Sequence, residues 1–429
     1  MISKKQFPLL LIILSTTLFA QNTSPNYKLY GFIRNDFYLN TRQNVEAIDG
    51  LFLMFPKPEE KVGGKDKNDV AQAEMLSVGS RIGVDITGAD MLGAKTSAKF
   101  ETDFAGFGTN NYVLRIRQAY TKFNWEKSEL LVGQTWHPMF GSVIPVTMSL
   151  NTGSPFQPFN RSPQIRFKQN LGKTASLMLA ATYQLQYVSQ GYLSTTTSVS
   201  IDADGKLKET KTINTGGSNT FMKNSLIPNL FVGTEFKTKQ WLSGLGVDFK
   251  AINPSTNVLN PSFSAVAYSQ YVNPVFQIKA KAVWGQNLSD HLMIGGYGVS
   301  KYESDNKTVA SYTNFNTVSS WINAVYGKKM QVGIFLGISE NLGTDEALAL
   351  STANKFTAYG YGFYDGSQQI LDRLYRVMPH VSYNLPNLKF GLEYDYTAGE
   401  YGNVNSNGRV SSTYTVRNHR AVASICYFF

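Results

Sequence analysis

The chain has 429 residues and a net charge of +10, with 42% apolar and only 16% charged residues. This charged fraction is well below the roughly 25% of an average soluble domain. Lys and Arg form no long runs, which argues against a nucleic-acid-binding tail, because such tails cluster their charge. The single cysteine, Cys426, excludes a disulfide framework and any zinc site built from cysteines. After residue 20, no apolar run approaches the roughly 18 residues of a membrane-spanning helix.

The first twenty residues have the three parts of an export signal in the right order. Lys4 and Lys5 give the positive start, Leu9 to Leu14 the apolar stretch, and Leu18 to Ala20 a cleavage site. We therefore expect residues 1–20 to be a signal peptide and residues 21–429 to form the exported protein.

The exported part alternates between apolar and polar residues with a period of two, which predicts β-strands. Residues 76–87 are an example, because one face of this segment carries Leu76, Val78, Ile82, Val84 and Ile86. Such a strand fits a soluble sandwich, with its polar face in water, or a membrane barrel, with its apolar face in lipid. Periodicity alone does not separate these two folds.

The lengths of the connections between strands distinguish a membrane barrel from a soluble sandwich. The sixteen predicted strands cover approximately 27–40, 74–88, 92–106, 112–126, 129–137, 163–170, 173–189, 225–237, 240–252, 262–272, 275–286, 315–327, 329–340, 373–385, 387–400 and 413–429. Turns after the even-numbered strands are tight, whereas most loops after the odd-numbered strands are long. The long loops are 41–73, 138–162, 190–224, 287–314, 341–372 and 401–412. An even strand number with short turns at one end and long loops at the other predicts an all-β, transmembrane antiparallel β-barrel.

The last strand supports a barrel in the outer membrane of a Gram-negative bacterium. One face of this strand carries Ala421, Ala423, Ile425, Tyr427 and Phe429. Aromatic residues at the end of an apolar strand face are expected at the membrane interface.

Five segments of the first third resemble the DcaP-like trimeric outer-membrane porins of Gram-negative bacteria. They are KLYGFIRND (28–36), SRIGVDITG (80–88), LRIRQAY (114–120), LLVGQTWHP (130–138) and SPQIRF (162–167). The resemblance implies a 16-stranded barrel, a homotrimer, and a constriction formed by a loop that folds inward after the fifth strand. It also implies a preference for small anions such as dicarboxylates. The rest of the chain matches only in architecture.

The polar strand faces of this first third carry many charged side chains. The predicted pore-lining residues are Arg34, Asp36, Arg81, Lys95, Lys99, Arg115, Arg117, Arg161, Arg166 and Lys168. Because Arg or Lys on the lipid face costs about 2–4 kcal/mol at the bilayer midplane, these faces should look into the lumen. Two interpretations remain open. The residues form a basic ladder that attracts anions, or each charge is neutralised by a neighbour, as the spacing of Arg81 and Asp85 suggests.

Loop 138–162 is the predicted constriction, while loops 41–73, 190–224, 287–314 and 341–372 are expected outside the cell. The constriction loop contains four prolines and no Asp or Glu, and it therefore favours a positive potential at the narrowest point. Its predicted anchors are Trp136, His137, Phe140, Phe156 and Phe159. We interpret His137 as a wall or anchor residue rather than a ligand.

The sequence offers no catalytic constellation, and we predict neither enzyme activity nor a cofactor. The four histidines have no metal-ligand spacing. The leading hypothesis is a porin for passive diffusion of small hydrophilic solutes, with modest preference for anionic or zwitterionic ones. The alternative is a structural or adhesive barrel that binds a partner through its extracellular loops. Expected partners are outer-membrane lipid and lipopolysaccharide, the solutes and two further copies of the chain, but not nucleic acid.

Overall fold

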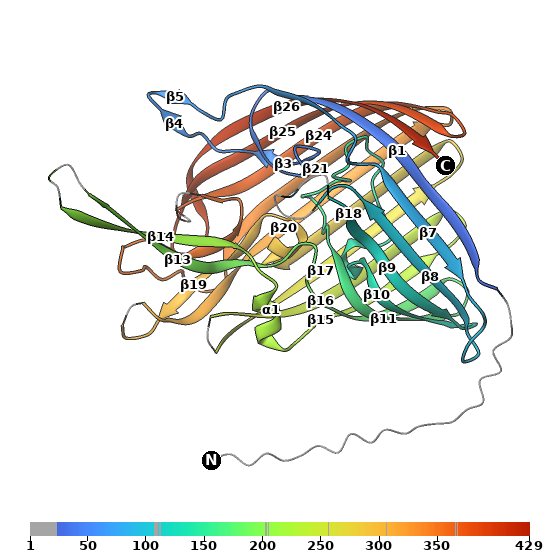
Figure 1. Cartoon of the computed structure of the whole chain (residues 1–429), viewed down its shortest axis with the longest axis horizontal. Coiled ribbons are helices and arrows are strands. Elements are labelled where there is room, and N and C mark those ends of the chain that lie inside the picture. The colour runs from blue at the N-terminus through green and yellow to red at the C-terminus, as the bar shows by residue number, and fades with distance from the viewer. Residues whose placement is uncertain are drawn as a thin grey trace, which may run out of the picture.

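The structure is a computed structural model that describes residues 24–429, except for 107–109, 111–112, 202–203, 205, 256, 306, 365 and 367. The predicted signal peptide therefore lies outside the described residues. The described residues form a closed, 16-stranded antiparallel β-barrel (Figure 1), in which the first strand pairs with both the second and the last. The predicted fold class is confirmed.

Each predicted strand corresponds to one strand of the barrel wall. The wall consists of β1 (Asn26–Asn40), β6 (Gln72–Leu76) continued by β7 (Arg81–Thr87), β8 (Lys95–Asp103), β9 (Arg115–Asn124), β10 (Ser128–Trp136), β11 (Arg161–Leu171), β12 (Ala175–Thr182), β15 (Asn229–Lys237), β16 (Trp241–Ser255), β17 (Val258–Val272), β18 (Phe276–Gln286), β20 (Val309–Gly327), β21 (Met330–Thr344), β24 (Gln369–Asn384), β25 (Leu388–Val404) and β26 (Val410–Phe428). The largest difference in length is β12, which ends at Thr182 rather than at the predicted residue 189.

Short elements lie in the connections. They are β2 (Asn44–Ala47), β3 (Phe52–Pro56), β4 (Lys61–Val62), β5 (Lys65–Asp66), β13 (Gln190–Ile201), β14 (Leu207–Gly217), β19 (Gly295–Tyr302), β22 (Ala358–Tyr361), β23 (Phe363–Tyr364), the helix α1 (Thr220–Ser225) and the 3-10 helices η1 (Pro138–Phe140) and η2 (Leu288–His291). No helix among the described residues is long and apolar enough to cross a membrane.

The outer wall of the barrel is an apolar belt. In β1, Leu29, Ile33 and Phe37 are 61%, 51% and 46% exposed, whereas the neighbouring Asp36 is 1% exposed on the inner face. Large exposed apolar residues recur in the same way around the barrel. This inversion, with apolar residues outside and charged ones inside, is the pattern of a membrane-spanning barrel.

The second strand contains an irregularity that the alternation of apolar residues concealed. Leu76 pairs with Asp36, but Arg81 pairs with Phe32, so the segment between β6 and β7 contains one extra residue. A one-residue shift moves side chains to the opposite face. Leu76 is therefore 4% exposed on the lumen side, while Ile82 is 41% exposed on the outer wall. The prediction that both residues share one face is wrong.

The two ends of the barrel differ. The short turns, the start of β1 and the carboxyl end lie at the right in Figure 1, and the long loops lie at the left, where the β13–β14 ribbon projects from the barrel. In β26, Ala421, Ile425 and Tyr427 face outward. The backbone N–H of Phe429 donates to the carbonyl of Gly31 at 3.1 Å, which fastens the carboxyl end to the first strand.

Segments of three long loops, 41–73, 138–162 and 287–314, lie inside the lumen. Together these segments form a core inside the barrel. Loop 138–162 is buried along most of its length, as are residues 51–56 and 288–294. Their apolar side chains form one cluster with inward residues of the wall, among them Trp321 and Phe335. Loops 41–73 and 287–314, which the sequence placed outside, are thus partly internal.

Candidate functional site

Lys281, on the inner face of β18, holds two segments of loop 138–162, one near each end of the loop. Its ammonium group donates to the backbone carbonyl of Phe140 and, at 2.7 Å, to the side-chain carbonyl of Gln157. It also lies 4.9 Å from the centre of the Phe140 ring and 5.7 Å from that of Trp321. A buried ammonium surrounded by carbonyl oxygens and aromatic faces fixes both segments of the loop against the wall.

Arg376, on the inner face of β24, holds two loops at once. It donates to the carbonyl of Ser154 at 2.8 Å, and to the carbonyls of Leu53 and Met54 at 3.1 and 2.7 Å. Its Nε lies 3.4 Å from a carboxylate oxygen of Asp395. Because Ser154 belongs to loop 138–162 and Leu53 to loop 41–73, one guanidinium group joins both loops to the wall.

Glu393, on the inner face of β25, completes the attachment of loop 138–162. Its carboxylate accepts the backbone N–H groups of Met148 and Ser149 at 2.7 and 2.9 Å. The carbonyl of Met148 accepts from Arg34 on β1, which is itself paired with Asp36 at 2.7 Å. The loop is therefore held from strands at opposite ends of the chain.

We predict that Arg376→Met destabilises the barrel strongly. The change removes the guanidinium donor from three loop carbonyls and the cationic partner from the buried Asp395, and breaking a buried ion pair costs about 3–5 kcal/mol. Urea unfolding in lipid vesicles would measure this loss. The matched control is Arg373→Met in the same strand, whose partner Glu340 is 2.8 Å away at a partly exposed position; we expect about 0–1 kcal/mol there. Equal effects would show that Arg376 does not anchor the loops.

The predicted aromatic anchors form the root of loop 138–162. The ring of Trp136 stacks on that of Phe140 with a centroid distance of 3.9 Å, and Phe159 meets Trp136 edge-on at 4.9 Å. Phe156 packs against Phe335 of β21 at 6.0 Å. Phe140, Phe156 and Phe159 are buried on the lumen side and Trp136 is partly buried, which shields the loop's apolar residues from water.

His137 is buried at the same root. Its Nδ1 accepts the backbone N–H of Met139 at 3.2 Å, and its Nε2 lies 2.9 Å from the hydroxyl of Thr182. These contacts place His137 in the wall of the lumen, at the start of η1.

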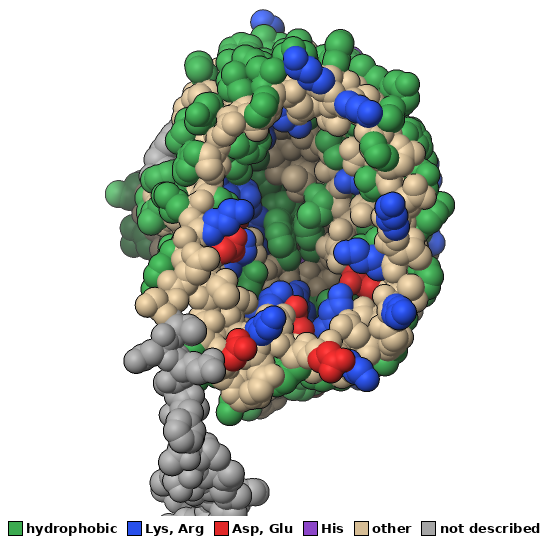
Figure 2. Space-filling model, turned by 90° about the vertical axis from the view of Figure 1, so that its right-hand side faces the viewer, with side chains coloured by type: hydrophobic (Ala, Val, Ile, Leu, Met, Phe, Trp, Pro, Cys, Tyr) green, Lys and Arg blue, Asp and Glu red, His purple; other side chains and the backbone are tan. Residues whose placement is uncertain are grey.

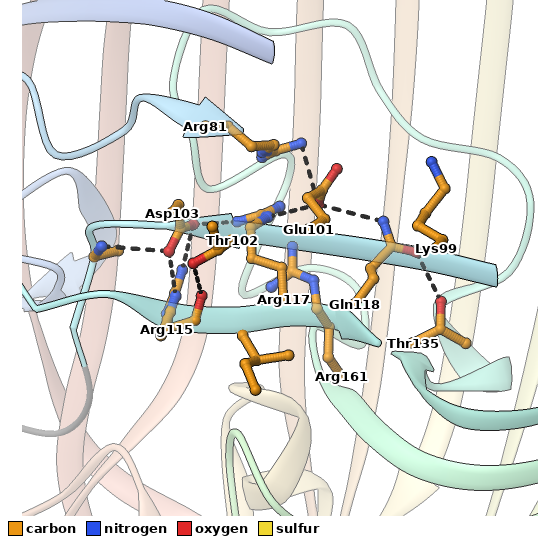
Figure 3. A network of polar contacts seen from close by, with 12 residues as sticks. Arg81, Lys99, Glu101, Thr102, Asp103, Arg115, Arg117, Gln118, Thr135 and Arg161 are labelled. Carbon is orange, nitrogen blue, oxygen red and sulfur yellow. Dashed lines mark hydrogen bonds and ion pairs between the residues drawn. The ribbon is translucent and has the colours of Figure 1, made fainter. Parts of the chain in front are cut away.

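A cluster of charges lies beside this root on β7, β8 and β9 (Figure 3). Arg115 forms a two-pronged ion pair with Asp103, with its shortest contact at 2.7 Å. Arg117 contacts both Asp103 and Glu101, the latter at 2.8 Å, and Arg81 lies 3.7 Å from Glu101. Three guanidinium groups thus share two carboxylates.

Arg161 approaches this network from β11 and has no carboxylate partner among the described residues. Its guanidinium carbon lies 3.7 Å from the centre of the Trp136 ring, and it donates to the side-chain carbonyl of Gln186 at 3.1 Å. With Arg161 included, four guanidinium groups face two carboxylates, which leaves an excess of positive charge.

These arginines line a cavity of about 220 Å³ in the lumen. On the wall side the cavity is lined by Arg81, Arg115, Arg117, Arg161 and Asp103. The loop side is apolar and includes Ile48 and Phe52 from loop 41–73 and Ile144 and Leu150 from loop 138–162. Low-dielectric surroundings strengthen the electrostatic field of such a positive wall.

The other predicted pore-lining residues lie outside this cavity and are mostly paired. The pairs are Arg34–Asp36, Lys99–Asp85, Arg166–Glu129 and Lys168–Glu235. Lys95 is exposed at the short-turn end and forms no ion pair with a described residue. Figure 2 views the hollow barrel from that end, where Lys and Arg outnumber Asp and Glu around the lumen. The charges of these four basic residues are therefore neutralised by neighbouring carboxylates. The arginine-lined cavity, in contrast, keeps an excess of positive charge.

The predicted pairing of Arg81 with Asp85 is wrong. Asp85 instead pairs with Lys99 at 2.8 Å, and Arg81 with Glu101. Residues four apart along a strand are about 13 Å apart, whereas residues opposite each other on adjacent strands are about 5 Å apart. Asp85 and Lys99 are directly opposite in the β7–β8 pairing.

The residues that hold the loops, namely Lys281, Arg376 and Glu393, were not predicted from the sequence. All three lie in the second half of the chain, where the family resemblance has no motifs. The sequence did contain a signal for Lys281. It lies between Ala280 and Ala282 on a strand whose outer face must be apolar, and this alternation places Lys281 on the inner face.

The fold is a membrane-spanning antiparallel β-barrel with an arginine-lined cavity in its lumen. No known sequence family matches the chain, and no curated protein is similar to it in sequence. Its structure is similar to the outer membrane channel DcaP of Acinetobacter baumannii, with a TM-score of 0.65 and 16% identity over 96% of this chain and 99% of that one. The predicted DcaP-like barrel is confirmed at the level of the fold.

Two further solved structures are similar over nearly the same length. The anion-selective porin from Comamonas acidovorans has a TM-score of 0.51 and 8% identity, over 95% of this chain and 100% of that one. OmpT of Vibrio cholerae, folded in vitro, has a TM-score of 0.51 and 10% identity, over 96% and 100%. At these identities the comparisons show a shared fold.

Proposed function

We propose that the protein is an outer-membrane porin of a Gram-negative bacterium, through which small hydrophilic solutes diffuse passively with modest preference for anions such as dicarboxylates. The cavity between the arginines of β7, β9 and β11 and the apolar loops carries this proposal. Selectivity in such channels comes from pore width and from the charges that line it. The proposal needs no catalytic step and no cofactor.

The charge distribution supports a preference for anions rather than a neutral pore. Four guanidinium groups and the carboxylate of Asp103 line the cavity, Glu101 lies beside it, and loop 138–162 contributes no carboxylate of its own. A dicarboxylate can accept from two guanidinium groups at once, which favours it over a monovalent anion of similar size.

Recording in a planar bilayer tests this proposal. We expect ohmic current steps of constant size, and a reversal potential under a tenfold KCl gradient that has the sign of chloride permeation. Adding a dicarboxylate should reduce the chloride current more than adding a neutral solute of equal size. A channel that prefers potassium would contradict the anion preference, and a silent membrane would contradict the porin itself.

A structural or adhesive barrel is the second candidate, because the β13–β14 ribbon projects far beyond the barrel and loops fill much of the lumen. Loops 190–224 and 287–314 would then bind the partner. A silent bilayer, together with binding of labelled protein to cells that is lost when the ribbon is removed, would favour this candidate.

We predict a homotrimer that resists heat in detergent. The prediction rests on the resemblance of the first six strands to DcaP-like porins, which place their subunit contacts there. Native mass spectrometry of unboiled protein should give three times the mass of the chain, and conductance should occur in groups of three steps. A monomer in mild detergent and in lipid nanodiscs would contradict the trimer.

A further inference from the structure

A second group of polar side chains is buried inside the barrel, apart from the arginine-lined cavity. His137 lies at the end of β10, Asp248 on the inner face of β16, and His291 at the end of η2. Each offers a nitrogen or carboxylate oxygen, and these three atoms lie within 4.8 Å of one another. The chain separates the three residues widely, and only the folding of η2 into the lumen brings them together.

Asp248 has no hydrogen-bond donor in this group. Its Oδ1 is buried and has no hydrogen-bond partner among the described residues, and Nε2 of His137 lies 3.8 Å from it. A carboxylate buried without a donor is strongly unfavourable, because it has lost its water and gained nothing in return. Such a group needs an explanation, and a bound cation provides one.

His291 has the arrangement of a metal ligand. Its Nδ1 is buried without a partner, while its Nε2 lies 3.9 Å from a carboxylate oxygen of Asp290. Asp290 is held in place by Lys250 at 2.5 Å and Gln184 at 3.1 Å. A carboxylate behind one ring nitrogen, with the other nitrogen free, is the usual surrounding of a metal-binding histidine.

His137 supplies the third ligand after a change of tautomer. In the structure its Nδ1 accepts from Met139, so its proton is on Nε2, which faces the Thr182 hydroxyl and Asp248. Coordination by Nε2 requires this proton to move to Nδ1, so the 3.2 Å hydrogen bond from the Met139 N–H is lost while a metal–nitrogen bond forms at Nε2. The Thr182 hydroxyl, 2.9 Å from Nε2, is close enough to contribute to a fourth position.

We propose that His137, Asp248 and His291 bind a zinc ion that fastens two internal loops to the barrel wall. Two imidazoles and one carboxylate form a ligand set typical of zinc. The ion would join the root of loop 138–162, through His137, to η2, through His291, and both to β16. Its double positive charge would offset Asp248 and Asp290, of which only Asp290 has a cationic partner, Lys250.

Measurement of the zinc content of the purified protein tests the proposed zinc site directly. The full-length exported protein, without a histidine tag, is purified in detergent, treated with a chelator and dialysed against micromolar zinc chloride. We expect one zinc per chain by elemental mass spectrometry. His291→Gln and Asp248→Asn should each reduce the zinc content at least five-fold. His419→Gln, which removes an exposed histidine on the outer wall, is the matched control and should keep one zinc.

Folding of each variant is checked by its heat-dependent mobility on gels. Cobalt substitution in the wild type is a second test, and it requires no variant. Cobalt bound in place of zinc should give the visible absorption bands of a four-coordinate ion with nitrogen and oxygen ligands. Wild-type protein without zinc or cobalt after dialysis would overturn the proposal. Zinc retained by both His291→Gln and Asp248→Asn, or lost in His419→Gln, would also overturn it, because the metal would then be bound elsewhere.

Discussion

Arg117→Glu is expected to remove the preference for anions or to convert it into a preference for cations. Arg117 contacts Asp103, which lines the arginine-lined cavity, and Glu101 beside it, so the variant leaves three carboxylates and three guanidinium groups in this cluster. After screening, a charge change of two units beside the pore should alter ion energies by about 1–2 kcal/mol. This corresponds to a roughly five- to thirty-fold change in the permeability ratio, which the reversal potential in a KCl gradient would measure.

Lys95→Glu is the matched control, because it makes the same charge change at an exposed position of the wide short-turn end. We expect a much smaller shift there, since water and salt screen the charge. A wild type that prefers cations would show that Asp36, Asp85, Glu101 and Asp103 dominate the lumen. An unchanged reversal potential in folded Arg117→Glu would place the ion path away from β9.

Deletion of residues 150–157 is expected to raise single-channel conductance roughly two-fold or more, because barrels of 16 strands enclose a wide aqueous channel unless loops narrow it. The deleted segment contains Leu150, which lines the cavity, and Phe156, which packs against Phe335. A wider pore keeps permeating ions farther from the arginines, so selectivity should also weaken. Conductance and reversal potential are measured beside the wild type in the same salt.

Shortening the β13–β14 ribbon by the same number of residues is the control for this deletion. The ribbon projects from the long-loop end, and its removal should leave conductance unchanged. A folded deletion variant with wild-type conductance and selectivity would show that residues 150–157 do not narrow the path. The narrowing would then be sought in loop 41–73, whose Phe52 lines the same cavity.

Most of the fold was predictable from the sequence. The strands of a membrane barrel alternate between apolar and polar residues, and the two ends of the barrel differ in the lengths of their loops. The shift between β6 and β7 was not predicted, since the apolar residues from Leu76 to Ile86 keep the same two-residue spacing on both sides of it, with only Ser80 between them. There, the hydroxyl of Ser80 accepts the backbone N–H of Arg34 at 3.0 Å and replaces part of the strand pairing. Only the three-dimensional pairing reveals such a contact.

The candidate site was predictable in part. The charged strand faces identified the arginines of β7, β9 and β11, but the loop contacts of Lys281 and Arg376 depend on tertiary packing between distant segments. The internal position of loop 41–73 left one signal in the sequence, the apolar run Leu51 to Phe55 within a charged loop. Such a run exposed to water is unfavourable, and in the structure these five residues are buried.

The attachment of two loops to Arg376 also determines how the pore can fluctuate. The guanidinium donates to Leu53 and Met54 of one loop and to Ser154 of the other, and Asn151 donates to the carbonyl of Leu53 at 3.1 Å. Neither loop can leave the wall without breaking bonds that hold the other. The two loops therefore form one mechanical unit, and any closing of the channel should occur in a single full step, without the intermediate current levels that two independent loops would produce.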